Sequence, residues 1–315
     1  MTIGIGIAGP RAGLAVWHAL RAVEAVGRGM IGGFVSMAAL SANGEVLRAE
    51  TQRCGSAGLF PGGSPPPARI AEARGAVLMS SGPDRTEPLS QFTPARADVA
   101  LITGHRLPNM PGGEGRPLNT VLLERIGAGE PAEAALAALL EENPQADAGL
   151  IAVTPDGGIV LGNSALVGQR TDAGSLRTQG AGLHIAVLHN AIFPVVGLAA
   201  IAAGAAMDAA APGDAHDLSL QLEAGLALKL ADTASLEADH RDIVRAITVT
   251  HPGWLSPHWQ GAVALRDTVV HRNGWVLGRL VTECYCVARE GILVSCDGQQ
   301  RAKLLALAAP SPLRQ

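Results

Sequence analysis

The sequence of 315 residues has few aromatic side chains, little lysine relative to arginine, and no strongly charged segment. Only 3% of the residues are aromatic and Tyr285 is the single tyrosine, so Ala, Val, Leu and Ile supply most of the core. Such side chains suit the close packing of helices on a sheet. The formal net charge is −4 and no basic run occurs, which argues against nucleic acid as a partner.

Four cysteines occur, Cys54, Cys284, Cys286 and Cys296, and none of them forms a Cys-x-x-Cys pair. A zinc site of familiar spacing is therefore not expected, and no cofactor is indicated. Reduced thiols and an opening segment without a recognisable secretion signal favour a cytoplasmic location. The uncharged stretch 191–207 is short for a bilayer and is predicted to be a buried helix, so no membrane association is expected.

The first 56 residues predict a strand, a helix and a β-hairpin. Residues 3–8 indicate a short buried strand with glycine at alternate positions, and residues 11–27 indicate a helix with an apolar stripe. Two β-rich runs follow, 34–40 and 46–51, and the Asn43-Gly44 pair between them is a strong hairpin signal.

Residues 118–164 repeat this order. Helices are predicted over 118–126 and from Pro131 to about Glu142, followed by a strand, an Asp156-Gly157 turn and another strand. Two units of a helix and a hairpin, 1–56 and 118–164, make a chance coincidence less plausible.

The rest of the chain is expected to complete one domain over residues 1–315. The segment 57–96 is loop-rich and holds one expected strand, 76–80, and further strands are expected over 98–103 and 183–188. A helix is predicted over 218–230. Residues 243–300 read as a C-terminal β-meander with strands at 243–249, 262–270, 275–281, 284–288 and 292–296.

The helix followed by GGFVSMAALSANGEV, and the later GAGEPAEAALAALL followed by AGLIAVTPDGGIVLGNS, resemble the N-terminal-nucleophile hydrolase superfamily. The pattern is most similar to isoaspartyl peptidases, glycosylasparaginases and their relatives, and it covers roughly the first half of the chain. The resemblance implies an α/β fold, a four-layer αββα sandwich built on the two helix-hairpin repeats.

The same resemblance implies a Thr, Ser or Cys nucleophile at the head of a strand, with its own amine as the base. The equivalent strand here begins with Gly33-Phe34, which offers no nucleophile. Thr2 is the alternative, because removal of Met1 would leave a threonine amine at the start of the first strand.

A second group of candidates lies in the segment 51–56, just past the first hairpin. Thr51 and Cys54 are candidate nucleophiles there, whereas Arg53 and Ser56 are candidate substrate contacts, since an arginine can bind a carboxylate or lower a thiol pKa. A polar strand end that runs into a loop is the alternative interpretation. Glu24 is expected to pair with Arg28 one helical turn later.

His105 and Asn163 complete the candidate substrate-binding residues, because each follows a predicted strand and ligands bind at strand ends. His251 and His258 flank a Pro- and Trp-containing loop, where an aromatic loop packed on the core is favoured over a metal site. Cys284 and Cys286 are expected to be core-facing structural thiols.

Together these features predict a hydrolase of a small amide or lactam with a Thr or Cys nucleophile. A catalytically inactive binding or assembly protein of the same fold is the first alternative, since Gly33-Phe34 lacks a nucleophile. A metal-dependent hydrolase is the second. The expected partner is a small-molecule substrate, and a homo-oligomer is possible.

Overall fold

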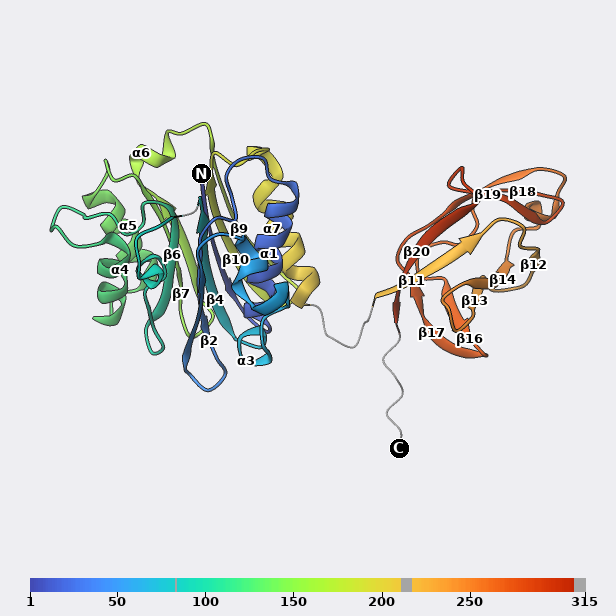
Figure 1. Ribbon diagram of the computed structural model, residues 1–315, viewed down its shortest axis with the longest axis horizontal. Coiled ribbons are helices and arrows are strands. Elements are labelled where there is room, and N and C mark those ends of the chain that lie inside the picture. The colour runs from blue at the N-terminus through green and yellow to red at the C-terminus, as the bar shows by residue number, and fades with distance from the viewer. Residues whose placement is uncertain (83, 211–216, 309–315) are drawn as a thin grey trace. The chain divides into compact units, whose positions relative to one another are not determined.

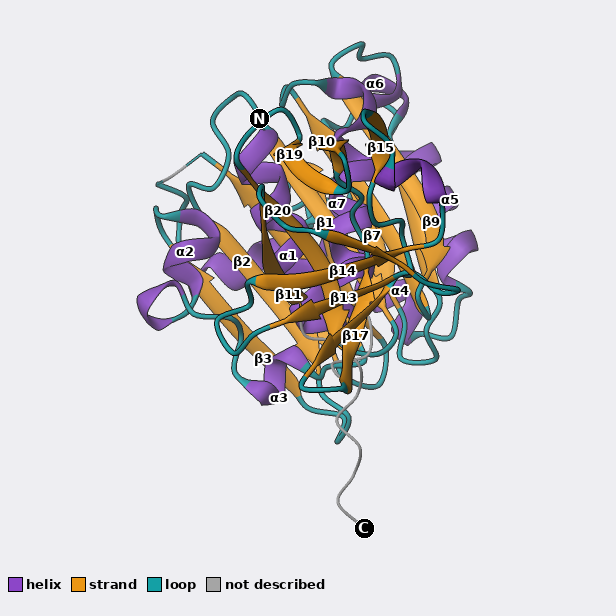
Figure 2. Ribbon diagram, turned by 90° about the vertical axis from the view of Figure 1, so that its right-hand side faces the viewer, coloured by secondary structure: helices purple, strands orange, loops and turns teal. Residues whose placement is uncertain are grey.

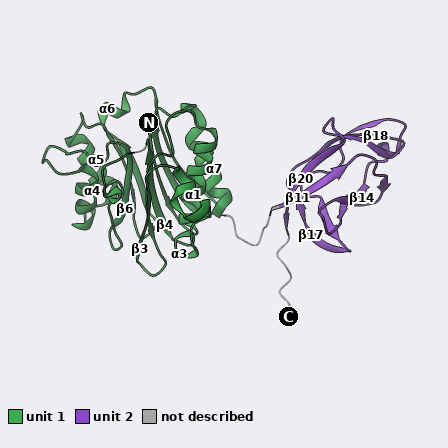
Figure 3. Cartoon of the chain, viewed as in Figure 1, with its two compact units in different colours: residues 1–211 green, residues 212–315 purple. Residues whose placement is uncertain are grey.

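The computed structural model describes residues 1–82, 84–210 and 217–308, and these form two compact units (Figure 3). The first unit comprises residues 1–211 and the second residues 212–315. The single domain expected from the sequence is therefore wrong. The reason is that the apolar residues of the second unit form a hydrophobic core of their own, separate from the cores of the first unit.

The centre of the first unit is a six-stranded antiparallel sheet with the order β3-β2-β4-β1-β10-β9. β1 pairs with β4 on one side and β10 on the other. The strands are β1 (Thr2–Ala8), β2 (Val35–Leu40), β3 (Val46–Thr51), β4 (Gly75–Ser81), β9 (Ala173–Gly180) and β10 (Leu183–Asn190).

The alternation of isoleucine and glycine along β1 assigns its two faces. Ile3, Ile5 and Ile7 are fully buried against the helices α1 (Ala12–Val26) and α7 (Val195–Ala210), which cover one face of the sheet (Figure 1). Burial of each isoleucine contributes about 1.5–3 kcal/mol. Gly4 and Gly6 face the other way, toward a second sheet, because β-strand side chains alternate between faces.

The second sheet of this unit is four-stranded and antiparallel, in the order β5-β6-β7-β8. It packs face to face on the first sheet through a shared apolar cluster, and its outer face is covered by two helices (Figure 1). The strands are β5 (Ala95–Arg96), β6 (Ala100–Arg106), β7 (Ala148–Val153) and β8 (Ile159–Asn163), and the helices are α4 (Leu118–Gly127) and α5 (Ala132–Glu142).

The two sheets approach closely because glycine backbones meet between them. A Cβ atom on Gly4 would lie 2.3 Å from the backbone oxygen of Gly104, and one on Gly6 would lie 2.6 Å from Cγ2 of Ile151. Side chains larger than hydrogen at these positions would force the sheets apart. The alternating glycines of β1 therefore set the distance between the sheets.

The mixed α/β class predicted from the sequence is confirmed, and both predicted hairpins are present. Gly44 and Gly157 adopt positive φ at the two turns, as Asn-Gly and Asp-Gly sequences favour. The strand predicted at 76–80 is β4. The segment 57–96 also contains short helices, namely α2 (Gly55–Leu59), η1 (Pro61–Gly63), α3 (Ala68–Ala71) and η2 (Leu89–Phe92), and α6 (Ala165–Gly168) follows β8.

The second unit consists of two sheets around its own core, and its strands are among those coloured orange in Figure 2. The larger sheet has the order β11-β20-β17-β16-β13-β14-β12 and the smaller sheet β15-β18-β19. Their elements are β11 (Asp217–Glu223), β12 (Leu228–Leu230), β13 (Ser235–Ala238), β14 (Val244–Val249), η3 (Pro252–Leu255), β15 (Trp259–Ala262), β16 (Val269–Arg272), β17 (Trp275–Leu280), β18 (Tyr285–Arg289), β19 (Ile292–Cys296) and β20 (Arg301–Ala308).

Two predictions for this region are wrong. The helix expected over 218–230 is replaced by the strands β11 and β12, because alternate leucines of β11 are buried and its backbone pairs with β20. The C-terminal strands do not form one meander over 243–300. β16 and β17 pair in the larger sheet, whereas β18 and β19 pair in the smaller one, and most of the strand expected at 262–270 is a turn.

Candidate functional site

Thr2, the first residue of β1, lies at one end of the space between the two sheets. Its side chain is on the same side of the strand as Gly4 and is only 3% exposed. The hydroxyl donates a hydrogen bond to Oδ1 of Asn190 (2.5 Å) and accepts one from the backbone N–H of Arg106 (2.6 Å). These two bonds fix the position of the hydroxyl oxygen.

The residues that pair with Thr2 on either side are also polar. In the sheet register Thr2 lies opposite Asn190 of β10 and Ser81 of β4. Nδ2 of Asn190 is buried and has no hydrogen-bond partner among the described residues, so this donor remains available for another acceptor. Oγ of Ser81 accepts a hydrogen bond from Nη2 of Arg85 (2.5 Å).

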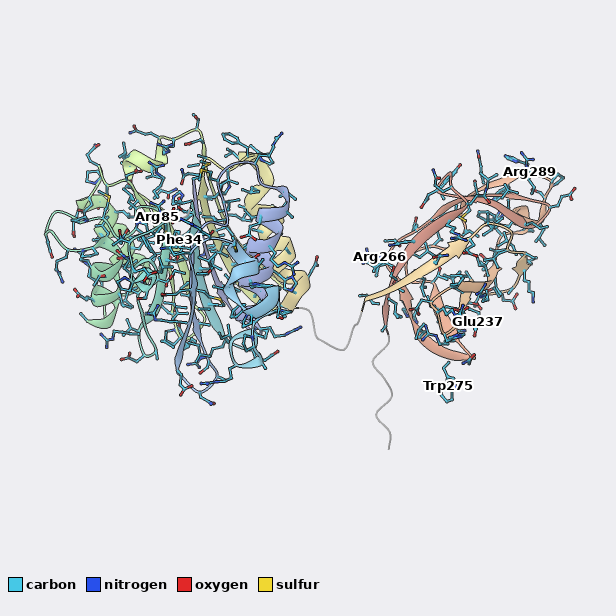
Figure 4. The ribbon with its side chains drawn as sticks, in the orientation of Figure 1. Phe34, Arg85, Glu237, Arg266, Trp275 and Arg289 are labelled. Atoms are coloured by element: carbon cyan, nitrogen blue, oxygen red, sulfur yellow. The ribbon has the colours of Figure 1, made fainter. Side chains whose placement is uncertain are left out.

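The guanidinium of Arg85 also lies at this end of the first unit. Its Cζ atom lies 5.9 Å from the centroid of the Phe34 ring, and both residues are labelled in Figure 4. Phe34 is itself fully buried in a small apolar cluster with Met79 and Phe92. This packing holds the cation near Ser81, and therefore near Thr2.

Arg106 is held by a bidentate ion pair with Asp147. Its Nε and Nη2 atoms lie 2.7 and 2.5 Å from the two carboxylate oxygens, and both side chains are about three-quarters buried. The hydrogen bonds from Arg106 lower the pKa of Asp147 below its usual value. Arg106 has a φ of 65°, a left-handed conformation that is uncommon for a non-glycine residue. The ion pair therefore helps to hold the backbone N–H that contacts Thr2.

His105 and Asn163 meet on the inner face of the four-stranded sheet. Nε2 of His105 lies 2.8 Å from Oδ1 of Asn163, and burial lowers the pKa of His105 to about 4. Nδ1 of His105 has no hydrogen-bond partner among the described residues. The structure thus brings together two residues that the sequence indicated separately, and His105 directly precedes Arg106, the neighbour of Thr2.

The amino group of Met1 lies close to the same cations. Partial burial, and then the charges of Arg106 and Arg85, lower its pKa below the usual value for an amine. The sulfur of Met1 accepts a hydrogen bond from the backbone N–H of Met30 (2.9 Å). An amine in these surroundings spends more time unprotonated at neutral pH, which is the form that accepts a proton.

The 51–56 segment begins at the edge strand β3, and its residue Gln52 exchanges hydrogen bonds with the backbone of Arg85. Arg53 and Cys54 are exposed at the start of α2, and Nη2 of Arg53 forms an ion pair with Asp84 at 2.6 Å. Ser56 is buried against α1, which covers the opposite face of the six-stranded sheet from the one that Thr2 faces. The structure therefore does not bring this segment together with His105 and Asn163.

Ser56 has a structural partner that the sequence did not indicate. Its backbone N–H donates to Oε1 of Glu24 (2.9 Å), its hydroxyl donates to Oε2, and its carbonyl oxygen accepts from the Trp17 indole (3.1 Å). Glu24 of α1 thus bonds Ser56 rather than forming the expected ion pair with Arg28. Because α1 and α2 pack together only through the tertiary fold, helical spacing could not reveal this contact.

Thr51 lines a surface hollow with Gln52, Glu87 and Leu89. Its hydroxyl donates a hydrogen bond to the backbone oxygen of Arg53 (3.3 Å), and no base lies within hydrogen-bond distance of it in the described structure. Burial raises the pKa of the neighbouring Glu50. The hollow offers acidic groups and no activated nucleophile.

The predicted loop histidines are not grouped for a metal ion. His251 stacks on Trp259 with a centroid distance of 4.6 Å, and its Nδ1 accepts a hydrogen bond from Gly253. Within the part of the chain that the structure describes, only Cys284, Cys286 and Cys296 place three potential ligand atoms within 4.8 Å of one another. The interpretation as an aromatic loop is thus supported, and a histidine-based metal site is not.

Sequence reasoning missed Asn190, Arg106, Asp147, Ser81 and Arg85. A signal for Ser81, Arg106 and Asn190 existed, since each lies within three residues after a predicted strand, where ligand-binding groups often gather. That these residues surround Thr2 could not be known before the pairing of β1 with β4 and β10 was known. Among the described residues, no helix is long and apolar enough to cross a membrane.

Fold and site together define a mixed α/β unit with a buried threonine at the head of its central strand, followed by an all-β unit. Residues 2–219 match the family described as Domain of unknown function (DUF6963), and the chain belongs to that family. Residues 225–301 match a second family, Domain of unknown function (DUF7259). The two matches follow the two compact units closely. No curated protein matches the chain.

Proposed function

We propose that the first unit is a hydrolase of the N-terminal-nucleophile type, with Thr2 as its nucleophile, which cleaves the C–N bond of a small amide or lactam. The observation that carries the proposal is the position of the Thr2 hydroxyl. It is held at the first residue of a buried central strand by Asn190 and by the backbone of Arg106. The layer order, two helices, two sheets and two helices, is consistent with the αββα sandwich of that superfamily.

Cleavage of the Met1–Thr2 peptide bond is required before this chemistry can start. The freed amine of Thr2 would accept the proton of its own hydroxyl, because a nearby unprotonated amine is a suitable base. Partial burial and the charges of Arg106 and Arg85 lower the pKa of the Met1 amino group, and these surroundings support the same effect on a Thr2 amine.

In the reaction, Oγ1 of Thr2 attacks the carbonyl carbon of the substrate and forms a tetrahedral intermediate. The negative charge on its oxygen needs a donor, and Nδ2 of Asn190 is a buried donor without a partner among the described residues. The proton held by the amine passes to the leaving nitrogen, and water then hydrolyses the Thr2 ester. In this scheme Arg106 and Asp147 position the backbone N–H at Thr2 and do not react.

Cys54 and Thr51 are not part of this proposal. Cys54 is exposed, and the neighbouring Arg53 is paired with Asp84. The substrate contacts proposed here are Asn163 and His105, which lie at the same end of the sheets as Thr2. We further propose a cytoplasmic protein with a small-molecule substrate that functions as a homo-oligomer.

The test starts with the intact mass of the purified full chain. Loss of the segment before Thr2 is expected, followed by stoichiometric acylation of Thr2 by a β-lactone probe. Release of amine from a panel of small amides and lactams should be lost in Thr2→Ala, partly retained in Thr2→Ser, and unchanged in the matched control Cys54→Ala.

Two results would overturn the proposal. An uncleaved Met1–Thr2 bond together with no β-lactone labelling would favour the inactive binding protein as the alternative. Labelling and hydrolysis that persist in Thr2→Ala but vanish in Cys54→Ala would move the nucleophile to the 51–56 segment.

A further inference from the structure

Three of the four cysteines gather on one face of the small sheet in the second unit. Cys286 of β18 lies directly opposite Cys296 of β19 in the antiparallel register, so both side chains point to the same face. Cys284 precedes Cys286 by two residues and lies on that side as well. All three side chains are fully buried, whereas Cys54 in the first unit is exposed.

The spacing of the sulfur atoms fits a shared metal ion. Sγ of Cys284 and Sγ of Cys286 are 3.6 Å apart, and all three Sγ atoms lie within 4.8 Å of one another. A metal–thiolate bond of about 2.3 Å separates the sulfurs by about 3.8 Å in a tetrahedral site and about 4.0 Å in a trigonal one. Small side-chain shifts would thus bring all three sulfurs to one centre.

Backbone hydrogen bonds hold the three cysteines in place. Cys286 lies in the middle strand of the sheet and pairs with Gly261 on one side and Cys296 on the other. The carbonyl oxygen of Cys284 accepts a bond from Val263, and the backbone N–H of Cys296 donates to Gln299 in the following turn. A site whose ligands are already positioned loses less conformational freedom on binding.

Asp297, which follows Cys296, links the end of β19 to the beginning of β18 by two hydrogen bonds. Its backbone N–H donates to the carbonyl oxygen of Tyr285 (2.7 Å), and its Oδ1 accepts from the Tyr285 N–H (2.9 Å). The Asp297 side chain also interacts with the Cys284 thiol. The Asp297 carboxylate lies outside the group of three sulfurs, so it would have to shift toward them to serve as a fourth ligand.

Metal binding requires the three cysteines to ionise in the core of the second unit. A thiolate is the form of cysteine that binds metals. In an apolar core a bound cation would compensate its charge.

We propose that Cys284, Cys286 and Cys296 bind one thiophilic metal ion, zinc(II) or copper(I), which stabilises the second unit. Binding of zinc(II) by three thiols releases three protons and leaves a net charge of −1. Copper(I) releases the same three protons and leaves −2. Zinc is expected to recruit Asp297 as its fourth ligand, whereas copper(I) is satisfied by three sulfurs.

The experiment uses the full chain, purified under reducing conditions and stripped of metal with a chelator. Titrations with zinc(II) alone and with copper(I) alone should each be followed against a competing chromophoric chelator. Cobalt(II) serves as the spectroscopic probe, because thiolate ligands give it an intense near-ultraviolet charge-transfer band. One ion per chain is expected, and the three buried thiols should react more slowly with a thiol reagent in the metal-loaded protein than in the metal-free protein.

Variants locate the site and distinguish the metals. Cys286→Ser and Cys296→Ser should weaken binding at least 100-fold, and Cys54→Ser, the matched control, should retain one ion per chain. Asp297→Asn should weaken zinc(II) at least 10-fold and leave copper(I) unchanged. Because buried substitutions can unfold the second unit, metal-dependent protection of the wild-type thiols provides a measurement that needs no variant.

Three results would overturn the proposal. The first is binding of less than a tenth of an equivalent of either metal by protein with four reduced thiols. The second is metal binding that is lost in Cys54→Ser. The third is a disulfide between two of the three cysteines in the purified protein, shown by a mass 2 Da below that of the reduced chain.

Discussion

Nε2 of His105 and Oδ1 of Asn163 lie 2.8 Å apart although β7 separates their strands. Both residues flank Gly149 of β7 in the register, and the hydrogen bond passes over this glycine. A side chain at position 149 would occupy the space in which the two groups meet. The hydrogen bond between His105 and Asn163 therefore requires glycine at position 149.

Gly149→Ala is expected to destabilise the first unit by about 1–3 kcal/mol. A Cβ atom there would lie 2.1 Å from Oδ1 of Asn163 and 2.5 Å from Nε2 of His105, so the pair must separate. Gly168→Ala is the matched control, since a Cβ at Gly168 meets nothing within 4 Å. Urea unfolding followed by hydrogen exchange of β6–β8 peptides measures both variants. Equal stability of the two would contradict the described packing.

Acidification is expected to destabilise the first unit through His105. Burial lowers its pKa from 6.5 to about 4, so between these pH values the unfolded chain binds more protons than the folded chain. The stability that the neutral His105 supports is complete above pH 6.5 and is lost as the pH falls toward 4. The loss is on the order of 3 kcal/mol.

Urea unfolding between pH 7 and pH 4 measures the slope of the unfolding free energy against pH. His105→Gln should flatten it in part, since burial also lowers the pKa of His189, whereas substitution of the exposed His184 by Gln should leave it unchanged. An unaltered slope in His105→Gln would show that another group governs the acid sensitivity.

Asp147→Asn is expected to cost about 1.5–3 kcal/mol, because hydrogen bonds to charged groups contribute this much and Arg106 would lose its counter-charge. Asp98→Asn provides the comparison. Asp98 also pairs with an arginine, Arg96, but both side chains are more than half exposed, so a change within about 1 kcal/mol is expected. Denaturant midpoints of the two variants measure the two losses of stability. A loss in Asp147→Asn no larger than that in Asp98→Asn would contradict the stabilising role of the Arg106–Asp147 ion pair.

Ser56→Ala is expected to destabilise the first unit by about 1–3 kcal/mol, because it removes a hydrogen-bond donor from the Glu24 carboxylate. Ser64→Ala, at an exposed position in the same region, should change stability by no more than about 0.5 kcal/mol. Thermal unfolding of both variants provides the measurement. If Ser56→Ala were as stable as wild type, the link between α1 and α2 would be unimportant for the fold.

Local sequence patterns predicted elements where one pattern was unambiguous. The alternating isoleucines of β1 and the Asn43-Gly44 turn each fit one structure. The leucines at 218, 222, 226 and 230 fit a helix by their spacing of four, but Leu220 between them fits a strand. Pairing with β20 decides in favour of the strand, and such a partner far along the chain cannot be read from local spacing.

The candidate site was predictable only in part for the same reason. Thr2, His105 and Asn163 were indicated as ends of strands, but the hydrogen bond of Thr2 with Asn190 joins residues 188 positions apart. The segment 51–56 was a candidate site only because several possible nucleophiles and an arginine lie close together in its sequence. Its hydrogen bonds with Glu24 and Asp84 depend on how α1 and the segment after β4 fold against it.

β1 pairs with β4 and β10 along its entire length, from Thr2 to Ala8. The backbone of Thr2 therefore cannot move toward a substrate unless its pairing with both neighbouring strands is broken. In the proposed reaction, selectivity would therefore depend on the connections that follow β4 and β10 at the same sheet end as Thr2. Engineering a new specificity would begin in those connections, with the strand itself left untouched.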